Sequence, residues 1–63
     1  MTQMAKFPLR VKTRDSTGAE IEVLCDTAES ALGNARHLRG MGHTYVWIED
    51  VDGRLVDEKS LYA

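Results

Sequence analysis

Two stretches of the chain alternate between apolar and polar residues, and the same four-residue pattern interrupts each of them. The pattern reads Asp-x-x-Gly and occurs at residues 15–18 and 50–53. An Asp side chain at the first position caps the turn, and Gly at the fourth accepts a positive φ, which is typical of a type I turn with a glycine bulge. We therefore expect two β-hairpins, over residues 8–25 and 44–57, with a helix between them.

The turn at Asp15 fixes the register of the first hairpin. Pro8 suits the first position of a strand, so the strand begins near Leu9, and the bulge sets Asp15 against Ala19. The pairs that follow are Thr13–Ile21, Val11–Val23 and Leu9–Cys25 on one face, and Arg14–Glu20 and Lys12–Glu22 on the other. The first face is apolar and the second pairs opposite charges, so three signals agree on this register.

Residues 27–40 have the spacing of an amphipathic helix. Asp26 or Thr27 suits its N-cap, and Asp26 with Glu29 would complete a capping box. Gly40 or Gly42 is expected to end it. The apolar positions form one narrow stripe, which consists of Ala28, Ala31, Leu32, Ala35 and Leu38. Because most of these side chains are small, we expect the helix to lie close to the sheet.

The second hairpin carries the aromatic residues. Its bulged turn sets Asp50 against Arg54 and Ile48 against Val56. The residues that then face the helix are Val46, Ile48 and Val56. The residues left on the opposite face are Tyr45, Trp47 and Leu55. Residues 57–63 either extend the last strand or fray, and an alternative is that Leu61 and Tyr62 pack back over Trp47 and cover it.

These elements predict a single α+β domain of ββαββ type over residues 1–63. One helix packs on one face of a mostly antiparallel four-stranded sheet, and residues 1–6, which show no period, are expected to be disordered. A right-handed crossover favours the first and third strands in the centre of the sheet. The alternative is the sequential order 1-2-3-4 with a parallel middle pair.

Composition excludes several classes of protein. The 63 residues are 43% hydrophobic and 29% charged, as in an ordinary globular domain, and the formal net charge of −2 gives no general attraction to nucleic acid or anionic lipid. A single cysteine, Cys25, excludes an intramolecular disulfide. With no secretory segment and no long apolar run, we expect a cytoplasmic protein that does not enter a membrane.

The candidate ligands and nucleophiles form no pattern that binds a metal or catalyses a reaction. A calcium-loop alignment of the second turn puts Ile48 and Lys59 where carboxylates are needed. Cys25, His37 and His43 match no zinc spacing, and Cys25 on the inward face is expected to be an inert hydrophobe rather than a nucleophile paired with His37. We therefore predict a protein that is not an enzyme and has no cofactor, metal or small-molecule substrate.

Two interaction hypotheses remain, and the preferred one is a small protein-binding module. One helix covers only one face of a four-stranded sheet, so Tyr45, Trp47 and Leu55, with Leu24 as a further candidate, would form an apolar patch on the other face. Such a patch suits a protein partner or a homodimer, and an exposed edge strand could add a further contact.

The alternative is a weak nucleic-acid binder. Its face would consist of Arg10, Lys12, Arg14 and Trp47. Basic residues interleaved with aromatic rings on a sheet hold single strands by phosphate neutralisation and base stacking. Glu20 and Glu22, directly across from the basic residues, reduce their field.

Residues 27–61 resemble small bacterial ββαββ domains of unknown function. The similarity lies in the helix pattern of Ala31, Ala35-Arg36 and Leu38 with its following glycine, in the strand Val46-Trp47-Ile48-Glu49-Asp50, and in Asp52-Gly53-Arg54. The resemblance implies this fold and a bacterial origin. It carries over no functional residue, because such families have no assigned chemistry.

Overall fold

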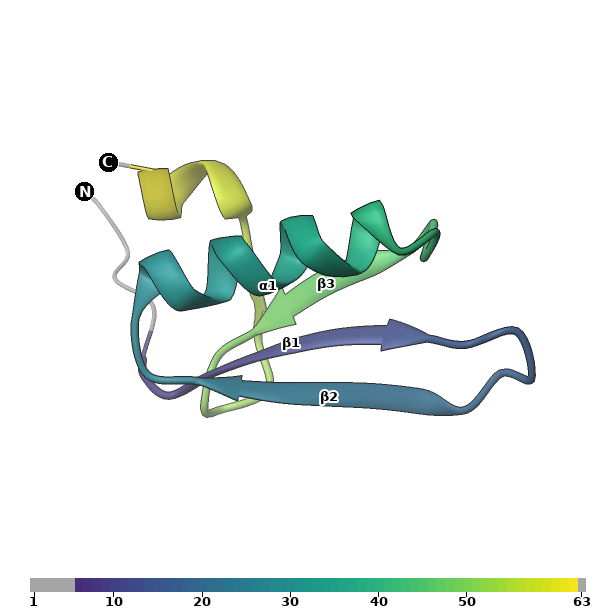
Figure 1. Cartoon of the computed structure of the whole chain (residues 1–63). Coiled ribbons are helices and arrows are strands. Elements are labelled where there is room, and N and C mark those ends of the chain that lie inside the picture. The colour runs from purple at the N-terminus through teal and green to yellow at the C-terminus, as the bar shows by residue number, and fades with distance from the viewer. Residues whose placement is uncertain (1–5, 63) are drawn as a thin grey trace.

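The computed structural model describes residues 6–62. Its elements are β1 (Leu9–Arg14), β2 (Glu20–Cys25), α1 (Ala28–Gly40), β3 (Val46–Glu49), β4 (Leu55–Val56) and the 3₁₀ helix η1 (Glu58–Tyr62). The four strands form one sheet in the order β2-β1-β3-β4, and every neighbouring pair is antiparallel. This confirms the α+β class and the central position of the first and third strands, and it rules out the parallel middle pair. α1 lies across one face of the sheet (Figure 1).

The first hairpin has the predicted turn and the predicted register. Asp15 donates its N–H to the Ala19 carbonyl over 3.0 Å and accepts the Gly18 N–H on its own carbonyl over 3.0 Å, with Gly18 at φ 87°. The Asp15 carboxylate also accepts the N–H groups of Thr17 and Ala19. All five predicted cross-strand pairs are present, with Arg10–Leu24 as the sixth.

The second hairpin repeats this turn. Gly53 has φ 81° and donates its N–H to the Asp50 carbonyl over 2.9 Å, while the Asp50 N–H reaches the Arg54 carbonyl over 2.9 Å. The predicted pairing of Ile48 with Val56 is confirmed. The predicted disorder of residues 1–6 lies outside the described residues except for Lys6, whose carbonyl accepts a hydrogen bond from the turn.

The helix begins one residue later than a capping box would require. Thr27 is the N-cap, and its hydroxyl accepts the Ser30 N–H over 3.0 Å. The predicted box between Asp26 and Glu29 is therefore wrong, because that box needs Asp26 at the N-cap. At the other end, Gly42 at φ 103° completes a Schellman motif, in which the N–H groups of Gly42 and His43 bond back to the carbonyls of the last helical turn.

The core lies between α1 and the sheet. Its buried residues are Leu9, Val11, Cys25, Ala31, Ala35, Leu38, Val46 and Ile48. Ala31 and Ala35 are fully buried, so the small helix residues do allow a close approach to the sheet. The predicted inward residues Ile21, Val23 and Val56 are only half-buried, because they lie on the two edge strands beyond the reach of one helix.

The C-terminal segment packs on the helix side of the sheet. η1 lies beside α1 (Figure 1), and Leu61 packs against the core. Arg39 on α1 forms a two-point ion pair with Glu58 and donates to the Val46 carbonyl over 3.3 Å. The predicted strand extension or fraying is therefore wrong, and so is the alternative in which Leu61 and Tyr62 cover Trp47.

Candidate interaction face

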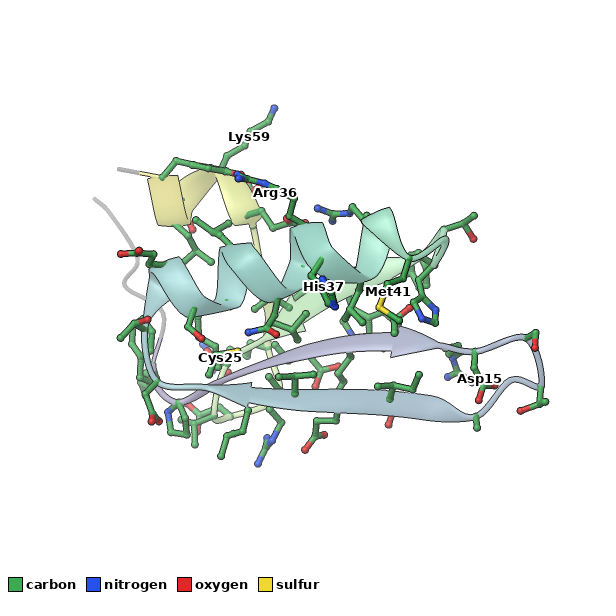
Figure 2. The ribbon with its side chains drawn as sticks, in the orientation of Figure 1. Asp15, Cys25, Arg36, His37, Met41 and Lys59 are labelled. Carbon is green, nitrogen blue, oxygen red and sulfur yellow. The ribbon has the colours of Figure 1, made fainter. Side chains whose placement is uncertain are left out.

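The face of the sheet opposite α1 carries no element of the described chain. We call it the open face, and its side chains project away from the helix (Figure 2). It consists of Glu20, Glu22 and Leu24 on β2, Arg10, Lys12 and Arg14 on β1, Trp47 and Glu49 on β3 with the preceding Tyr45, and Leu55 on β4. The strands therefore divide the open face into an acidic column, a basic column and an aromatic column, with Leu55 at the edge.

An ion-pair network joins the acidic and basic columns. The Lys12 ammonium lies 3.2 Å from a Glu49 oxygen, 3.7 Å from Glu22 and 3.9 Å from Glu20. The Arg10 Nε lies 3.5 Å from Glu22. The Lys12 side chain is only 15% exposed, so it lies along the sheet instead of extending into solvent. Within residues 6–62, Arg14 is the cation of this face that forms no ion pair.

The network shifts the acid–base properties of its members. The hydrogen bond from Lys12 to Glu49, reinforced by the nearby carboxylates, raises the pKa of the Lys12 ammonium. The hydrogen bond from the Trp47 indole, followed by that from Lys12, lowers the pKa of the Glu49 carboxyl. Both groups are therefore held in their charged forms, and the centre of the open face is a balanced set of paired charges.

Tyr45 and Trp47 form an aromatic pair next to this network. Their ring centroids are 5.0 Å apart and the ring planes are inclined by 33°. The Trp47 indole N–H donates to Glu49 over 2.8 Å, and the buried Thr13 hydroxyl donates to the Tyr45 carbonyl over 2.7 Å. The core therefore positions the backbone of Tyr45, and the ion-pair network orients Trp47.

Leu55 extends the aromatic column to the β4 edge. It lies opposite Glu49 and diagonal to Trp47, and an open groove at this edge is lined by Leu55 and Trp47 together with Asp57 and Lys59. Tyr45 is 67% exposed and Leu55 is 75% exposed. The structure thus places the three predicted interaction residues on one strip of the open face, where Tyr45 and Leu55 are exposed and Trp47 is half-buried.

The residues of the predicted nucleic-acid face lie on the same side of the sheet, and two of the three basic ones already form ion pairs with carboxylates. Arg10 and Lys12 form ion pairs with carboxylates, whereas Arg14 forms none within the described part of the chain. Of the charge pairs expected between β1 and β2, the one between Lys12 and Glu22 is present, whereas Glu20 pairs with Lys12 and not with Arg14.

Glu49 is the residue of this face that sequence reasoning missed. It joins the Trp47 indole and the Lys12 ammonium, and it lies across from Arg10. The register between β1 and β3 would have identified it, but those strands are far apart in sequence and no turn fixes their pairing.

The cysteine and histidine that were considered as a catalytic pair do not lie together. Cys25 is buried beneath the first half of α1, where its sulfur accepts a hydrogen bond from Asn34 over 3.4 Å, whereas His37 is exposed on the last helical turn (Figure 2). Within residues 6–62, no group of three or more His, Cys, Asp or Glu side chains is arranged to hold a metal ion. In the same range, no helix combines the length and apolar character needed to cross a bilayer.

Comparison with known proteins found no matching family model, curated protein or solved structure. The resemblance to bacterial ββαββ domains therefore stays a prediction.

Proposed function

We propose that this protein is a non-enzymatic interaction module that associates with a second copy of itself through the open face. The observation that carries the proposal is the exposure of Tyr45 and Leu55 on a sheet face that no described element covers. Exposed aromatic and aliphatic side chains beside polar groups are common in protein interfaces.

The summed charge of the open face is compatible with a second copy of the same face as the partner. The ionised residues of the open face are three acids, Glu20, Glu22 and Glu49, and three bases, Arg10, Lys12 and Arg14. A face that sums to zero repels a second copy little, and it attracts a polyanion little.

Solution mass across a concentration series tests the proposal. Tyr45→Glu removes the most exposed ring of the open face and places a carboxylate next to Arg14, so we expect the monomer fold to tolerate it. The matched control is Tyr62→Glu, because Tyr62 is 61% exposed but lies in η1 on the other side of the sheet. We expect the wild type and Tyr62→Glu to dimerise and Tyr45→Glu to stay monomeric. Equal dimerisation of both variants would contradict the proposed face.

Nucleic-acid binding is the second candidate, and one observation favours it: Arg14, which forms no ion pair within residues 6–62, lies one position beyond the paired Thr13 and Val46, at the end of the sheet that carries Tyr45. The test is titration with a single-stranded oligonucleotide at low and high salt. Phosphate contacts would make the affinity fall steeply with salt and weaken it in Arg14→Ala. A binding constant that does not change with salt would exclude this candidate.

A further inference from the structure

We propose that the two copies pack open face to open face about a two-fold axis that runs parallel to the strands, between β1 and β3. The inference rests on the proposed function and specifies the geometry of that association. It follows from the order of the columns across the sheet, in which β1 and β3 are central and β2 and β4 are the edges.

The charge columns distinguish between the two symmetric ways of stacking such a face. A two-fold axis perpendicular to the strands would lay each strand over its own copy, so that Glu20 and Glu22 would meet the acidic column again. An axis parallel to the strands reverses the column order instead. It lays β1 over β3 of the second copy and β2 over β4, so the acidic column does not meet its own copy. Sheets that pack in the aligned manner keep their strands within about 30° of each other, which preserves this correspondence.

We call a set of residues that are paired across the four strands a row. When the rotation places the row that contains Arg10 over its own copy, each residue meets a residue of complementary chemistry. Cross-strand pairs give the order Leu24, Arg10, Glu49, Leu55 across the sheet. Reversing the row places Arg10 over Glu49 of the second copy and Leu24 over Leu55 of the second copy. An oppositely charged pair and an apolar pair therefore each form twice, as an isologous interface requires.

The neighbouring rows bring cations onto aromatic rings. Lys12 lies opposite Trp47 in its own sheet, so the rotation places it over Trp47 of the second copy. One row further, exposed Arg14 is placed over exposed Tyr45 of the second copy. Cations on aromatic faces attract, and this contact gives Arg14 a partner that it lacks among residues 6–62.

At the rim, the rotation brings Glu22 near the groove that contains Asp57 of the second copy, which is a like-charge contact. The face is also small, since β4 contributes only two residues. We therefore expect a weak dimer, which calls for protein concentrations from about 10 µM to about 1 mM.

The two leucines provide a test of the axis. Leu24 and Leu55 are 61% and 75% exposed and lie on opposite edges of one sheet, so substitutions there do not meet within a chain. Leu24→Glu places a carboxylate beside Arg10, and Leu55→Lys places an ammonium beside Glu49, so each variant is compatible with its own monomer. Across the proposed axis, the new carboxylate and the new ammonium face each other.

We expect each variant alone to dimerise at least about tenfold more weakly than the wild type, because a charge is buried against a leucine. The equimolar mixture should form a heterodimer within about threefold of the wild-type affinity, since it pairs the two new charges and keeps one leucine pair. Native mass spectrometry and sedimentation equilibrium measure both, and circular dichroism verifies the folds.

The outcomes separate the geometry from the proposed function. In one outcome, the wild type dimerises, Tyr45→Glu does not, and the mixture of Leu24→Glu and Leu55→Lys associates no more tightly than either variant alone. This result would overturn the proposed axis but support the proposed function. A wild type that is monomeric up to about 1 mM would overturn both.

Discussion

The two faces of this sheet use the same four strands but stabilise the molecule in different ways. The helix side is mainly apolar, with Thr13 as a fully buried polar residue whose hydroxyl is satisfied. The open face holds its charges in a network at the surface, next to exposed aromatic and aliphatic groups. Burial of apolar area contributes far more to folding than exposed ion pairs do. We infer that the helix side determines the stability of the fold and that the open face is available for binding.

The largest expected effect is at Leu9, which is fully buried on the helix side. Leu9→Ala leaves a cavity beneath α1 and should lower the free energy of unfolding by about 2–5 kcal/mol. Urea unfolding followed by circular dichroism measures this at a low protein concentration. The matched control is Leu24→Ala on the open face, which should change the value by no more than about 0.5 kcal/mol. Similar losses in the two variants would show that the faces do not differ as described.

The next effect concerns the hydrogen bond that the buried Thr13 hydroxyl donates to the Tyr45 carbonyl. Thr13→Val keeps the shape of the side chain but leaves the Tyr45 carbonyl without its 2.7 Å partner. We expect a loss of about 1–2 kcal/mol in the free energy of unfolding. The same exchange at exposed Thr44 serves as the control. Because the bond also positions Tyr45, Thr13→Val should broaden the Tyr45 amide signal in NMR spectra, and an unchanged signal would argue against this connection.

A smaller effect is expected from acid, which acts on ion pairs on both sides of the sheet. The Arg39 guanidinium lowers the pKa of the Glu58 carboxyl below its ordinary value of 4.5. A lowered folded-state pKa stabilises the protein above that ordinary value, and this stabilisation is lost as the pH falls through the folded-state pKa. Glu58→Gln should therefore reduce the loss of stability on acidification below about pH 4.5, by up to about 1 kcal/mol.

Urea midpoints between neutral and acidic pH measure this difference. Glu29→Gln on α1 is the control, because Glu29 has no ion pair among residues 6–62. A Glu58→Gln profile that runs parallel to the wild type would exclude a stabilising role for the pair with Arg39. Glu49→Gln tests the open face in the same way, since hydrogen bonds from Trp47 and Lys12 also lower the pKa of Glu49.

The two hairpins show which features could be predicted from sequence. In the first hairpin, turn chemistry, apolar alternation and opposite charges act over a few residues and agree, so its register is correct to the residue. The N-cap was ambiguous because Asp26 and Thr27 are both good caps, and local preferences between them differ little.

The features that could not be predicted depend on contacts between distant residues. η1 packs beside α1 because Arg39 reaches Glu58, nineteen positions away, and no periodic pattern signals that pair. Glu49 joins the network on the open face through the pairing of β1 with β3, which no tight turn fixes. The shared face of Trp47 and Leu55 could be predicted because alternation along a strand determines the face of each residue.

The smallest effect on the free energy of unfolding is expected at Leu55, on the open face. The same residue should have a large effect on dimer formation. Leu55→Ala removes a side chain that is 75% exposed, so the monomer should lose no more than about 0.5 kcal/mol. In the proposed dimer the same side chain contacts Leu24 of the second copy, and the two-fold symmetry removes this contact twice. The dissociation constant of the dimer should therefore rise by about tenfold or more. Sedimentation equilibrium and urea unfolding of one preparation measure the two quantities. An unchanged dissociation constant would remove Leu55 from the interface. A large change in association with an intact fold would instead show that Leu55 contributes to association and not to folding.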